Sequence, residues 1–223
     1  MKCKTIFITG TDTGVGKTVL TALLARFLRG RGFNVAALKP VCSGGRDDAL
    51  ALRKALDGAL TLDEINSWHF RAAIAPSLAA KQEKKSVKLA PVLAHIRAVR
   101  KKSDVTLVEG AGGLLSPLGE NFDSRDLIIA LRATPIVVAQ NRLGAVNHVL
   151  LTLEALPKNY RTKAKVVLMS PARPNSATGS NAGLLEQFFP RERIFTLPWL
   201  GKRFAPPTAL KNPQLRRTLQ KLI

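Results

Sequence analysis

Gly10-Thr-Asp-Thr-Gly-Val-Gly-Lys-Thr18 decides the fold, and it lies between an apolar run at residues 5–9 and an amphipathic stretch that begins at Val19. Strand, glycine loop and helix in this order are the context in which proteins bind phosphate. In such a loop, backbone N–H groups converge on the phosphate oxygens, a lysine bridges the outer phosphates and a hydroxyl binds Mg²⁺. We therefore predict a triphosphate site at this loop.

Single residues of the loop match these tasks. Gly14 and Gly16 free the backbone, Lys17 supplies the positive charge and Thr18 supplies the hydroxyl. The usual pattern has a glycine at the position of Thr11, so a glycine-rich turn without a ligand is the alternative. The flanking strand and helix patterns favour the phosphate site.

Composition indicates one globular domain, residues 1–223. The chain has 223 residues, of which 46% are hydrophobic, enough to bury a full core. The first residues show no leader-like succession of charged, apolar and small residues, and no apolar run approaches about 18 residues. We expect a cytoplasmic protein without a membrane segment. Cys3 and Cys42 have no metal-type spacing, which predicts reduced thiols, and the three scattered histidines give no zinc site.

The net charge of +20 is unusual. Nucleic acid, an acidic partner and anionic small molecules are the partner classes that such a charge suggests. Residues 81–102 hold eight basic residues against Glu83 alone, without interleaved aromatic residues on which bases could stack. We therefore expect a solvated basic surface and no nucleic-acid partner.

Apolar, strand-like runs alternate with helix-like segments along the chain. The predicted strands are residues 5–9, 35–39, 105–109, 136–140, 166–169 and 194–197. The predicted helices are residues 17–31, 48–56, 91–102, 126–131, 145–156 and 182–188. Continuous hydrophobicity in the strands implies burial on both faces, which predicts an α/β fold of three layers, with a mainly parallel central sheet flanked by helices. Ligands of such sheets bind at the carboxyl ends of the strands.

Two strand ends carry candidate residues. Lys39 precedes a proline, which keeps it extended at the sheet edge, and Ser43 and Gly44 follow as possible contacts for a polar ligand. An ordinary surface lysine is the alternative. Glu109 ends the third strand, where a carboxylate can complete magnesium coordination, and Asp47 or Asp48 is expected to cap the next helix or to bind the same ion.

A further stretch, Asn141-Arg-Leu-Gly-Ala-Val-Asn-His148, leads into a predicted helix. Free N–H groups at a helix start, with Arg142 nearby, can receive an anion such as a carboxylate. Ordinary helix initiation explains the same residues, so this stretch alone does not separate the two interpretations.

Taken together, the motifs resemble the dethiobiotin synthetase family over about the whole chain, in the family's order. The matching stretches are Gly10-Thr-Asp-Thr-Gly-Val-Gly-Lys-Thr18, Lys39-Pro-Val-Cys-Ser-Gly44, Asp48-Ala-Leu-Ala-Leu52, Val108-Glu-Gly-Ala-Gly-Gly113, Arg142-Leu-Gly-Ala-Val-Asn-His148 and Leu197-Pro-Trp-Leu200. The resemblance implies a P-loop NTPase fold and an ATP-dependent ligase that converts 7,8-diaminononanoate and CO2 to dethiobiotin, ADP and phosphate through a carbamate and a carbamic-phosphoric anhydride.

The resemblance also implies roles for single residues. Mg²⁺ is expected at Thr18, Asp48 and Glu109, and the catalytic residues are expected to be Lys17, Lys39 and Ser43. The expected contacts of ATP are Thr13, Gly14, Val15, Gly16, Lys17, Thr18, Val19, Gly112, Ser170, Pro198, Trp199 and Leu200. The expected contacts of the diamine substrate are Lys39, Ser43, Gly113, Leu143, Gly144 and Asn147. The family works as a homodimer in which the helix start at Gly144 receives the substrate carboxylate across the interface.

Some positions depart from the family pattern. Gly14 replaces a common glutamate, Ser77 replaces a histidine, and Ser170-Pro171 replaces an asparagine-aspartate pair that reads adenine. Lys202-Arg-Phe-Ala-Pro-Pro207 stands where an acidic residue is usual. One lost hydrogen bond to the base is worth about 0.5–1.5 kcal/mol, so we expect retained nucleotide binding with relaxed base selectivity, other nucleoside triphosphates included.

Other classes of protein share the predicted fold. A partition-type ATPase switch would use a basic surface on DNA, but it usually carries an extra lysine early in the loop, where this chain has Thr11, Asp12 and Thr13. The cobyrinic-acid amidating enzymes append a glutamine-hydrolysing domain for which this chain is too short. A relative that binds nucleotide without ligase activity stays open as a third alternative.

Overall fold

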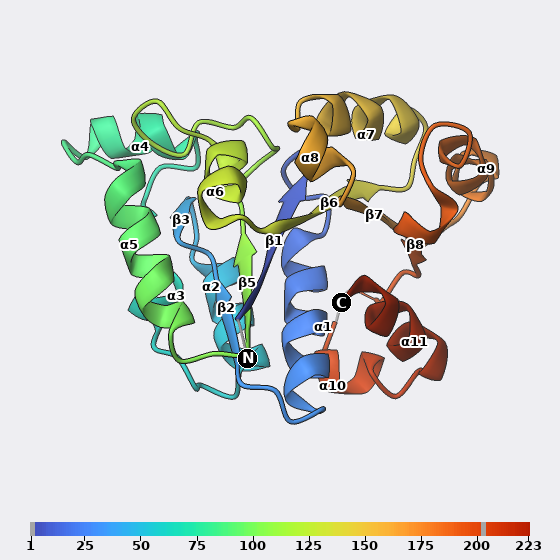
Figure 1. Ribbon diagram of the computed structural model, residues 1–223, viewed down its shortest axis with the longest axis horizontal. Helices are drawn as coiled ribbons and strands as arrows, with labels where there is room; N and C mark the ends of the chain where they lie inside the picture. The colour runs from blue at the N-terminus through green and yellow to red at the C-terminus, as the bar shows by residue number, and fades with distance from the viewer. Residues whose placement is uncertain (1–2, 202–203) are drawn as a thin grey trace.

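The computed structural model describes residues 3–201 and 204–223, so the predicted departure at Lys202 and Arg203 and the first two residues lie outside the description. A sheet of six strands, all paired in parallel, runs through the middle (Figure 1). Its strand order is β2-β5-β1-β6-β7-β8. The strands are β1 Lys4–Gly10, β2 Val35–Leu38, β5 Val105–Glu109, β6 Thr134–Gln140, β7 Lys165–Met169 and β8 Ile194–Leu197.

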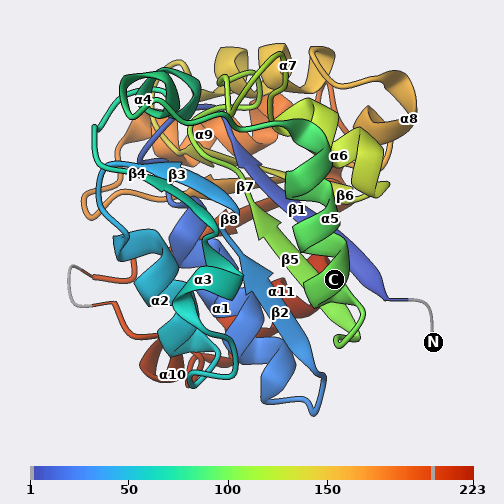
Figure 2. The same cartoon turned by 90° about the vertical axis from the view of Figure 1, so that its left-hand side faces the viewer.

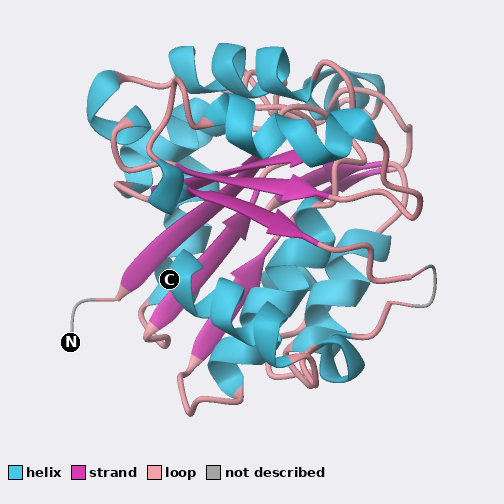
Figure 3. Ribbon diagram, turned by 90° about the vertical axis from the view of Figure 1, so that its right-hand side faces the viewer, coloured by secondary structure: helices cyan, strands magenta, loops and turns pink. Residues whose placement is uncertain are grey.

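Helices cover both faces of this sheet (Figure 3). One face packs on α1 Lys17–Arg29, α2 Asp47–Ala55, α3 Leu62–Ile65, α10 Pro206–Ala209 and α11 Pro213–Leu222. The other face packs on α4 Pro76–Gln82, α5 Leu89–Arg100, α6 Ser124–Leu131, α7 Ala145–Glu154, α8 Lys158–Arg161 and α9 Ser176–Leu185. A 3-10 turn, η1 Arg191–Arg193, precedes β8.

The central strand β1 explains why the strands are continuous apolar runs in the sequence. Phe7 points into the core under α5 and α6, while its neighbours Ile6 and Ile8 point into the core under α1. All three side chains are buried, because successive residues of a strand face opposite sides of the sheet. The three-layer prediction is confirmed.

A second, two-stranded parallel sheet, β3 Val41–Ser43 and β4 Trp68–Phe70, lies beside α4 (Figure 2). The sequence analysis did not predict it, since three-residue strands are too short to show a period. This small sheet carries Ser43 away from the main sheet, to a position next to residues 72–76.

The predicted strands all exist, with ends shifted by up to two residues, but one helix was misplaced. Of the predicted residues 182–188, only residues 182–185 are helical, because α9 begins six residues earlier, at Ser176, and ends at Leu185. Asn175 caps it by accepting from the backbone N–H of Thr178, whose hydroxyl in turn accepts from the N–H of Asn175. Five further helices, α3, α4, α8, α10 and α11, were not predicted.

Among the described residues, no helix combines the length and the apolar character that crossing a membrane requires. The loops that follow the carboxyl ends of β1, β2 and β5 gather at one edge of the sheet. Glu109 ends β5, Lys39 follows β2 and the phosphate loop follows β1, so the topology alone brings these parts of the predicted site together.

Candidate nucleotide and substrate site

The loop between β1 and α1 has the backbone that its glycines predict. Gly14 and Gly16 have φ values of 71° and 99°, a region that side chains disfavour. Gly16 is the N-cap residue of α1, and no described side chain caps this helix, so its first N–H groups are available to an anion. A Cβ atom at Gly16 would lie 3.0 Å from Cγ of Met169, which shows how closely the loop rests on the end of β7.

The predicted metal ligands and Lys39 form one contact network. Nζ of Lys39 donates to Oδ2 of Asp48 and to Oε1 of Glu109, each at 2.7 Å. The hydroxyl of Thr18 lies 2.8 Å from Oδ1 of Asp48 and 2.7 Å from the same Glu109 oxygen. The ends of two strands, β2 and β5, and the starts of two helices, α1 and α2, therefore converge on one point.

Burial gives this network its electrostatic character. Lys39 is 3% exposed and Glu109 is 1% exposed. Burial by itself would lower the pKa of Lys39, but the charges of Glu109 and Asp48 and their hydrogen bonds outweigh it and raise that pKa. The pKa of Asp48 is lowered, because the charge of Lys39 and the hydrogen bonds from Lys39 and Thr18 outweigh the opposing effect of burial. Both groups are therefore charged at neutral pH.

Lys17 is the second buried cation of the site. Its Nζ donates to the carbonyl oxygen of Asp12 at 2.7 Å, which folds the side chain over the loop. Burial, with the nearby charge of Lys39, lowers the pKa of Lys17 to about 8. An anion placed in the loop would relieve this unfavourable burial of charge.

The donor set fits Mg²⁺. Oε2 of Glu109 is buried and has no hydrogen-bond partner among the described residues, which is costly unless a cation binds there. Asp48, Glu109 and the hydroxyl of Thr18 offer the oxygen ligands that Mg²⁺ prefers. In the described residues no cluster of three His, Cys, Asp or Glu side chains exists, so such an ion would complete its shell with phosphate and water.

A cavity of about 730 Å³ opens in front of this network. Its lining includes Lys17, Thr18, Lys39 and Asp48, together with residues 73–76, 111–112 and 116–117. Ser43 also lines it, although its hydroxyl donates to the carbonyl of Ile74. Thr13, Gly14, Gly16, Val19 and Gly112, which were predicted to contact the nucleotide, complete this wall.

A second cavity, of about 500 Å³, lies on the other side of the phosphate loop and is mostly apolar. It contains the remaining predicted nucleotide contacts, namely Val15, Ser170, Pro198, Trp199 and Leu200. Gly14, Gly16 and Val19 line both cavities. The two spaces therefore meet along the loop, as a nucleotide that spans them requires.

Four predicted substrate contacts lie outside the first cavity. Gly113 lines a shallow hollow of about 480 Å³ with Thr11 and Asp12. Leu143, Gly144 and Asn147 lie at the exposed start of α7, and Leu143 is 81% exposed. Within one chain these residues do not meet Lys39.

The predicted cap at Asp47 or Asp48 is wrong. Arg46 is the N-cap residue of α2, and no described side chain accepts a capping hydrogen bond there. The Asp48 carboxylate turns to Lys39 and Thr18 instead, because a buried ammonium attracts it more strongly than exposed backbone N–H groups do.

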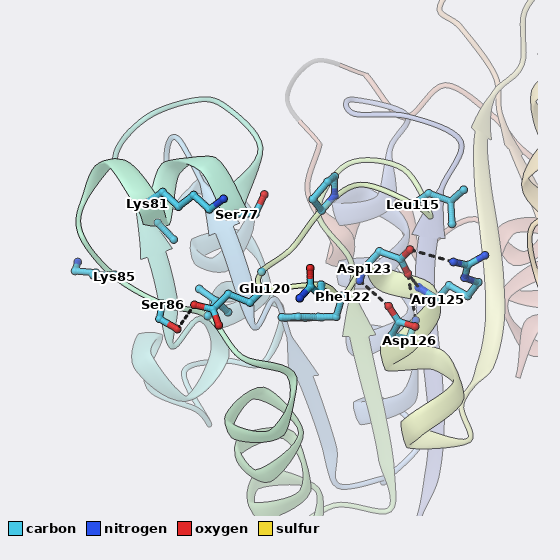
Figure 4. Close-up of a pocket in the computed structure, with 15 residues that line it drawn as sticks. Ser77, Lys81, Lys85, Ser86, Leu115, Glu120, Phe122, Asp123, Arg125 and Asp126 are labelled. Atoms are coloured by element: carbon cyan, nitrogen blue, oxygen red, sulfur yellow. Dashed lines mark hydrogen bonds and ion pairs between the residues drawn. The ribbon is translucent and has the colours of Figure 1, made fainter.

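A third cavity, of about 800 Å³, lies between α4 and α6 (Figure 4). Ser77 and Lys81 stand on one side of it, and Asp123, Arg125 and Asp126 stand on the other. Its acidic groups are engaged: Glu120 accepts from Ser86 at 2.6 Å, and both aspartates accept backbone N–H groups of the α6 start. It lacks the phosphate loop and the buried cations, so we assign the site to the two cavities above.

The sequence analysis missed several lining residues. Gln140 and Met169 end β6 and β7 and line the apolar cavity, so the rule that ligands meet strand ends could have found them. Ser116 lies beside Gly112, where a Cβ atom would be 2.4 Å from its hydroxyl. The two residues are only four positions apart, in a local turn in which the Ser116 hydroxyl accepts the N–H of Gly113.

The chain is similar to a known protein family and to several known proteins. Residues 4–206 match the family described as an AAA domain. ATP-dependent dethiobiotin synthetase BioD of Methanococcus vannielii is 37% identical over 163 residues, which is 73% of this chain and 77% of that protein. The protein of the same name from Anaeromyxobacter dehalogenans (strain 2CP-C) is 39% identical over 199 residues, 87% of this chain and 89% of that one.

Two solved structures share the fold. One is pNOB8 ParA bound to nonspecific DNA, with a TM-score of 0.56, 15% identity and coverage of 99% of this chain and 97% of that chain. The other is the signal recognition particle receptor FtsY from Elizabethkingia anophelis, with a TM-score of 0.51, 16% identity and coverage of 99% and 65%. At such low identity they bear on the fold alone, and they confirm the predicted P-loop NTPase architecture. Because its curated relatives match over most of their own length and of this chain, the chain belongs to the ATP-dependent dethiobiotin synthetase family.

Proposed function

We propose that this protein is a dethiobiotin synthase, a ligase that uses Mg²⁺ and ATP to carboxylate 7,8-diaminononanoate and close its ureido ring. The observation that carries the proposal is the position of Lys39. A buried lysine from the strand end beside the phosphate loop lies in the wall of the polar cavity, 2.7 Å from two carboxylates. A simple nucleotide switch has no need of this second cation.

The chemistry starts with an amine of the substrate. Its nitrogen attacks CO2 and loses a proton, which gives a carbamate. A carbamate oxygen then attacks the γ-phosphorus of ATP, and ADP leaves. The second amine attacks the carbonyl carbon of the resulting carbamic-phosphoric anhydride, loses a proton and expels phosphate, which closes the ring.

The charged residues of the site suit a reaction that brings two anions together. Carbamate and triphosphate are both anions, so bringing them together requires cations that cancel their repulsion. Lys17 and Lys39 both line the polar cavity and supply two such cations. Thr18, Asp48 and Glu109 would hold Mg²⁺, which neutralises phosphate charge when it is bound.

Lys39 changes partner in this proposal. In the structure its ammonium group is shared by Asp48 and Glu109. Asp48 and Glu109 would hold the metal ion, and the ammonium group of Lys39, which also lines the cavity, would then be able to bind the carbamate. Ser43 lines the same wall and would orient the carbamate end through its hydroxyl.

The apolar cavity would receive the base of ATP, the proposed co-substrate. Pro198, Trp199 and Leu200 offer flat apolar contacts, and Trp199 is 51% exposed at the rim. Ser170 is the polar residue at the position where the family resemblance implies an amide. Such a pocket would bind several bases, since stacking on an apolar wall does not read hydrogen-bond patterns.

Residues 1–223 would act as one ligase domain in a cytoplasmic homodimer. The exposed start of α7, with Leu143, Gly144 and Asn147, would reach the partner's cavity and bind the substrate carboxylate there. Leu151 and Leu115, 62% and 50% exposed, border the shallow hollow that Gly113 lines, and they would be covered in the dimer. We propose no nucleic-acid partner, in spite of the basic surface.

Phosphate release by the purified protein tests this function. With MgATP, the diamine and bicarbonate, we expect phosphate and ADP in equal amounts, together with a product whose mass is that of dethiobiotin. Omission of either the diamine or bicarbonate should abolish the signal. Hydrolysis that ignores both compounds, or that responds to DNA instead, would contradict the proposal and favour a nucleotide switch.

A further inference from the structure

The side chains of Lys39 and Asp48 are in contact, although their backbones belong to different elements. Lys39 follows β2, Asp48 is the second residue of α2, and the chain between them passes through β3 of the small sheet. Their side chains must nevertheless approach to 2.7 Å. Something other than the main sheet has to fix the distance between these two backbones.

Asn66 contacts the first of the two. It lies just after α3, is 1% exposed, and its Nδ2 donates to the carbonyl oxygen of Lys39 at 2.8 Å. The preceding residue, Ile65, accepts the backbone N–H of Lys39 at 2.9 Å. Both backbone groups of Lys39 are thus held by consecutive residues of one short segment.

Arg46 connects Asn66 to the start of α2, which carries Asp48. Its Nε donates to Oδ1 of Asn66 at 3.2 Å, and its Nη2 donates to the backbone carbonyl of Asn66 at 2.8 Å. Arg46 is also the residue from which α2 starts, and its own carbonyl accepts the N–H of Leu50. The planar guanidinium group therefore sets the position of the helix start relative to Asn66.

We infer that Asn66 and Arg46 are positioning residues of the reaction: they hold the Lys39 backbone and the start of α2 in the register that lets Lys39 face Asp48 and Glu109. The inference rests on the proposed function for its catalytic meaning. Neither side chain belongs to the described lining of the two cavities, so both act through Lys39 and Asp48.

If Asn66 and Arg46 served packing alone, their variants would differ from wild type in stability but not in kinetics. Loss of packing lowers stability and leaves the kinetics of the folded fraction unchanged. A shift of Lys39 and Asp48 lowers the turnover number and raises the Mg²⁺ requirement, whereas the phosphate loop, which neither residue contacts, keeps the KM for nucleotide nearly constant.

Arg46→Ala is the main variant, because the Arg46 side chain is 28% exposed and we expect the fold to tolerate its removal. Arg53→Ala is the matched control, since Arg53 is an exposed arginine on the same helix. Asp63→Ala removes the exposed partner of Arg46, whose side chain is 89% exposed, and leaves both Asn66 contacts in place.

In the diamine-dependent assay we expect Arg46→Ala to lower kcat by about ten- to a hundredfold, with KM for ATP within about threefold of wild type. Arg46→Lys should recover part of the loss, since lysine can make one of the two contacts with Asn66. Arg53→Ala and Asp63→Ala should match wild type. Equal kinetics for Arg46→Ala and Arg53→Ala would overturn the inference.

A measurement without any ligand separates this inference from the proposed function. Backbone hydrogen exchange in residues 39–48 should be faster in Arg46→Ala than in Arg53→Ala, and exchange in β1 and α1 should be unchanged. If wild type makes no product, the proposed function fails while this exchange experiment still decides the positioning. Unchanged exchange in residues 39–48 would overturn the positioning. Asn66→Ala should behave as Arg46→Ala does, and if it does not fold, the Arg46 variants decide.

Discussion

Nζ of Lys39 lies 2.7 Å from Oε1 of Glu109, and both side chains are almost completely buried. The two residues come from β2 and β5, which are direct neighbours in the sheet. A buried ion pair of this kind usually costs desolvation free energy that the pairing only offsets. Its place at the strand ends, with one oxygen of Glu109 unpartnered among the described residues, supports the proposal that the pair prepares a site for a metal ion and an anion.

Replacement of Lys39 tests its catalytic role. We expect Lys39→Ala to slow diamine-dependent phosphate release about a hundredfold or more, because a preorganised charge of this kind contributes about 3–4 kcal/mol to the transition state. Near-normal turnover would remove Lys39 from the mechanism.

The same substitution leaves Glu109 buried without its ammonium partner. Loss of one partner from a buried pair costs about 3–5 kcal/mol, so the unfolding temperature of Lys39→Ala should fall in metal-free buffer. Added Mg²⁺ should restore part of it by taking the place of the ammonium group. Thermal unfolding with and without Mg²⁺ provides this control for the kinetic result.

The carboxylates are predicted to bind the metal. Glu109→Gln and Asp48→Asn should each raise the Mg²⁺ concentration for half-maximal turnover by about tenfold or more, since a neutral amide is a poorer ligand for Mg²⁺. EDTA should abolish turnover in wild type. Asp47→Asn, at the exposed neighbour of Asp48, is the control. A Mg²⁺ requirement that is unchanged in both variants would exclude these ligands.

Base selectivity should be relaxed. The apolar cavity presents Pro198, Trp199 and Leu200, and Ser170 offers a hydroxyl where the family resemblance implies an amide, so ATP, GTP and CTP should give comparable turnover numbers. Ser170→Asn should raise the preference for ATP by about tenfold at most, the value of one hydrogen bond. A hundredfold preference for ATP in wild type would argue against this prediction.

The homodimer can be tested at α7. Leu151→Asp places a charge on the surface that the proposed partner covers, so we expect a monomer by light scattering and loss of most turnover. Phe33→Asp, at an exposed apolar residue in the turn after α1, should keep the wild-type state. A monomeric wild type with full activity would contradict the dimer.

Local patterns were enough to predict the main sheet. Each strand is a continuous apolar run, because both of its faces are buried, and the phosphate loop follows the first run directly. The position of Glu109 beside the loop followed from strand length alone. The strands, the phosphate loop and the place of Glu109 could therefore be predicted from the sequence.

Weak periodicity hid other elements. In α9, Gly179 and Gly183 interrupt the apolar repeat, so only its second half resembled a helix, although the cap at Asn175 was a usable signal. Thr61 and Glu64 form a capping box at α3, and Asn212 with Pro213 marks the start of α11. These signals were present in the sequence and were overlooked.

Other features have no local signature. The contact of Asn66 with Lys39 joins residues 27 positions apart, and a single asparagine between two predicted elements looks like an ordinary loop residue. The turn of Asp48 away from its own helix start depends on a lysine that arrives from another strand. Long-range electrostatics, and not propensity, decide both.

The phosphate loop is a thin shared wall, with Gly14 and Gly16 bordering the polar cavity on one side and the apolar cavity on the other. Two small inhibitors, one for each space, would therefore sit back to back across a single stretch of backbone. Joined by a short tether over Gly14, which leaves open space where a side chain would be, they would gain affinity from proximity alone. This route to a tight-binding compound requires no triphosphate.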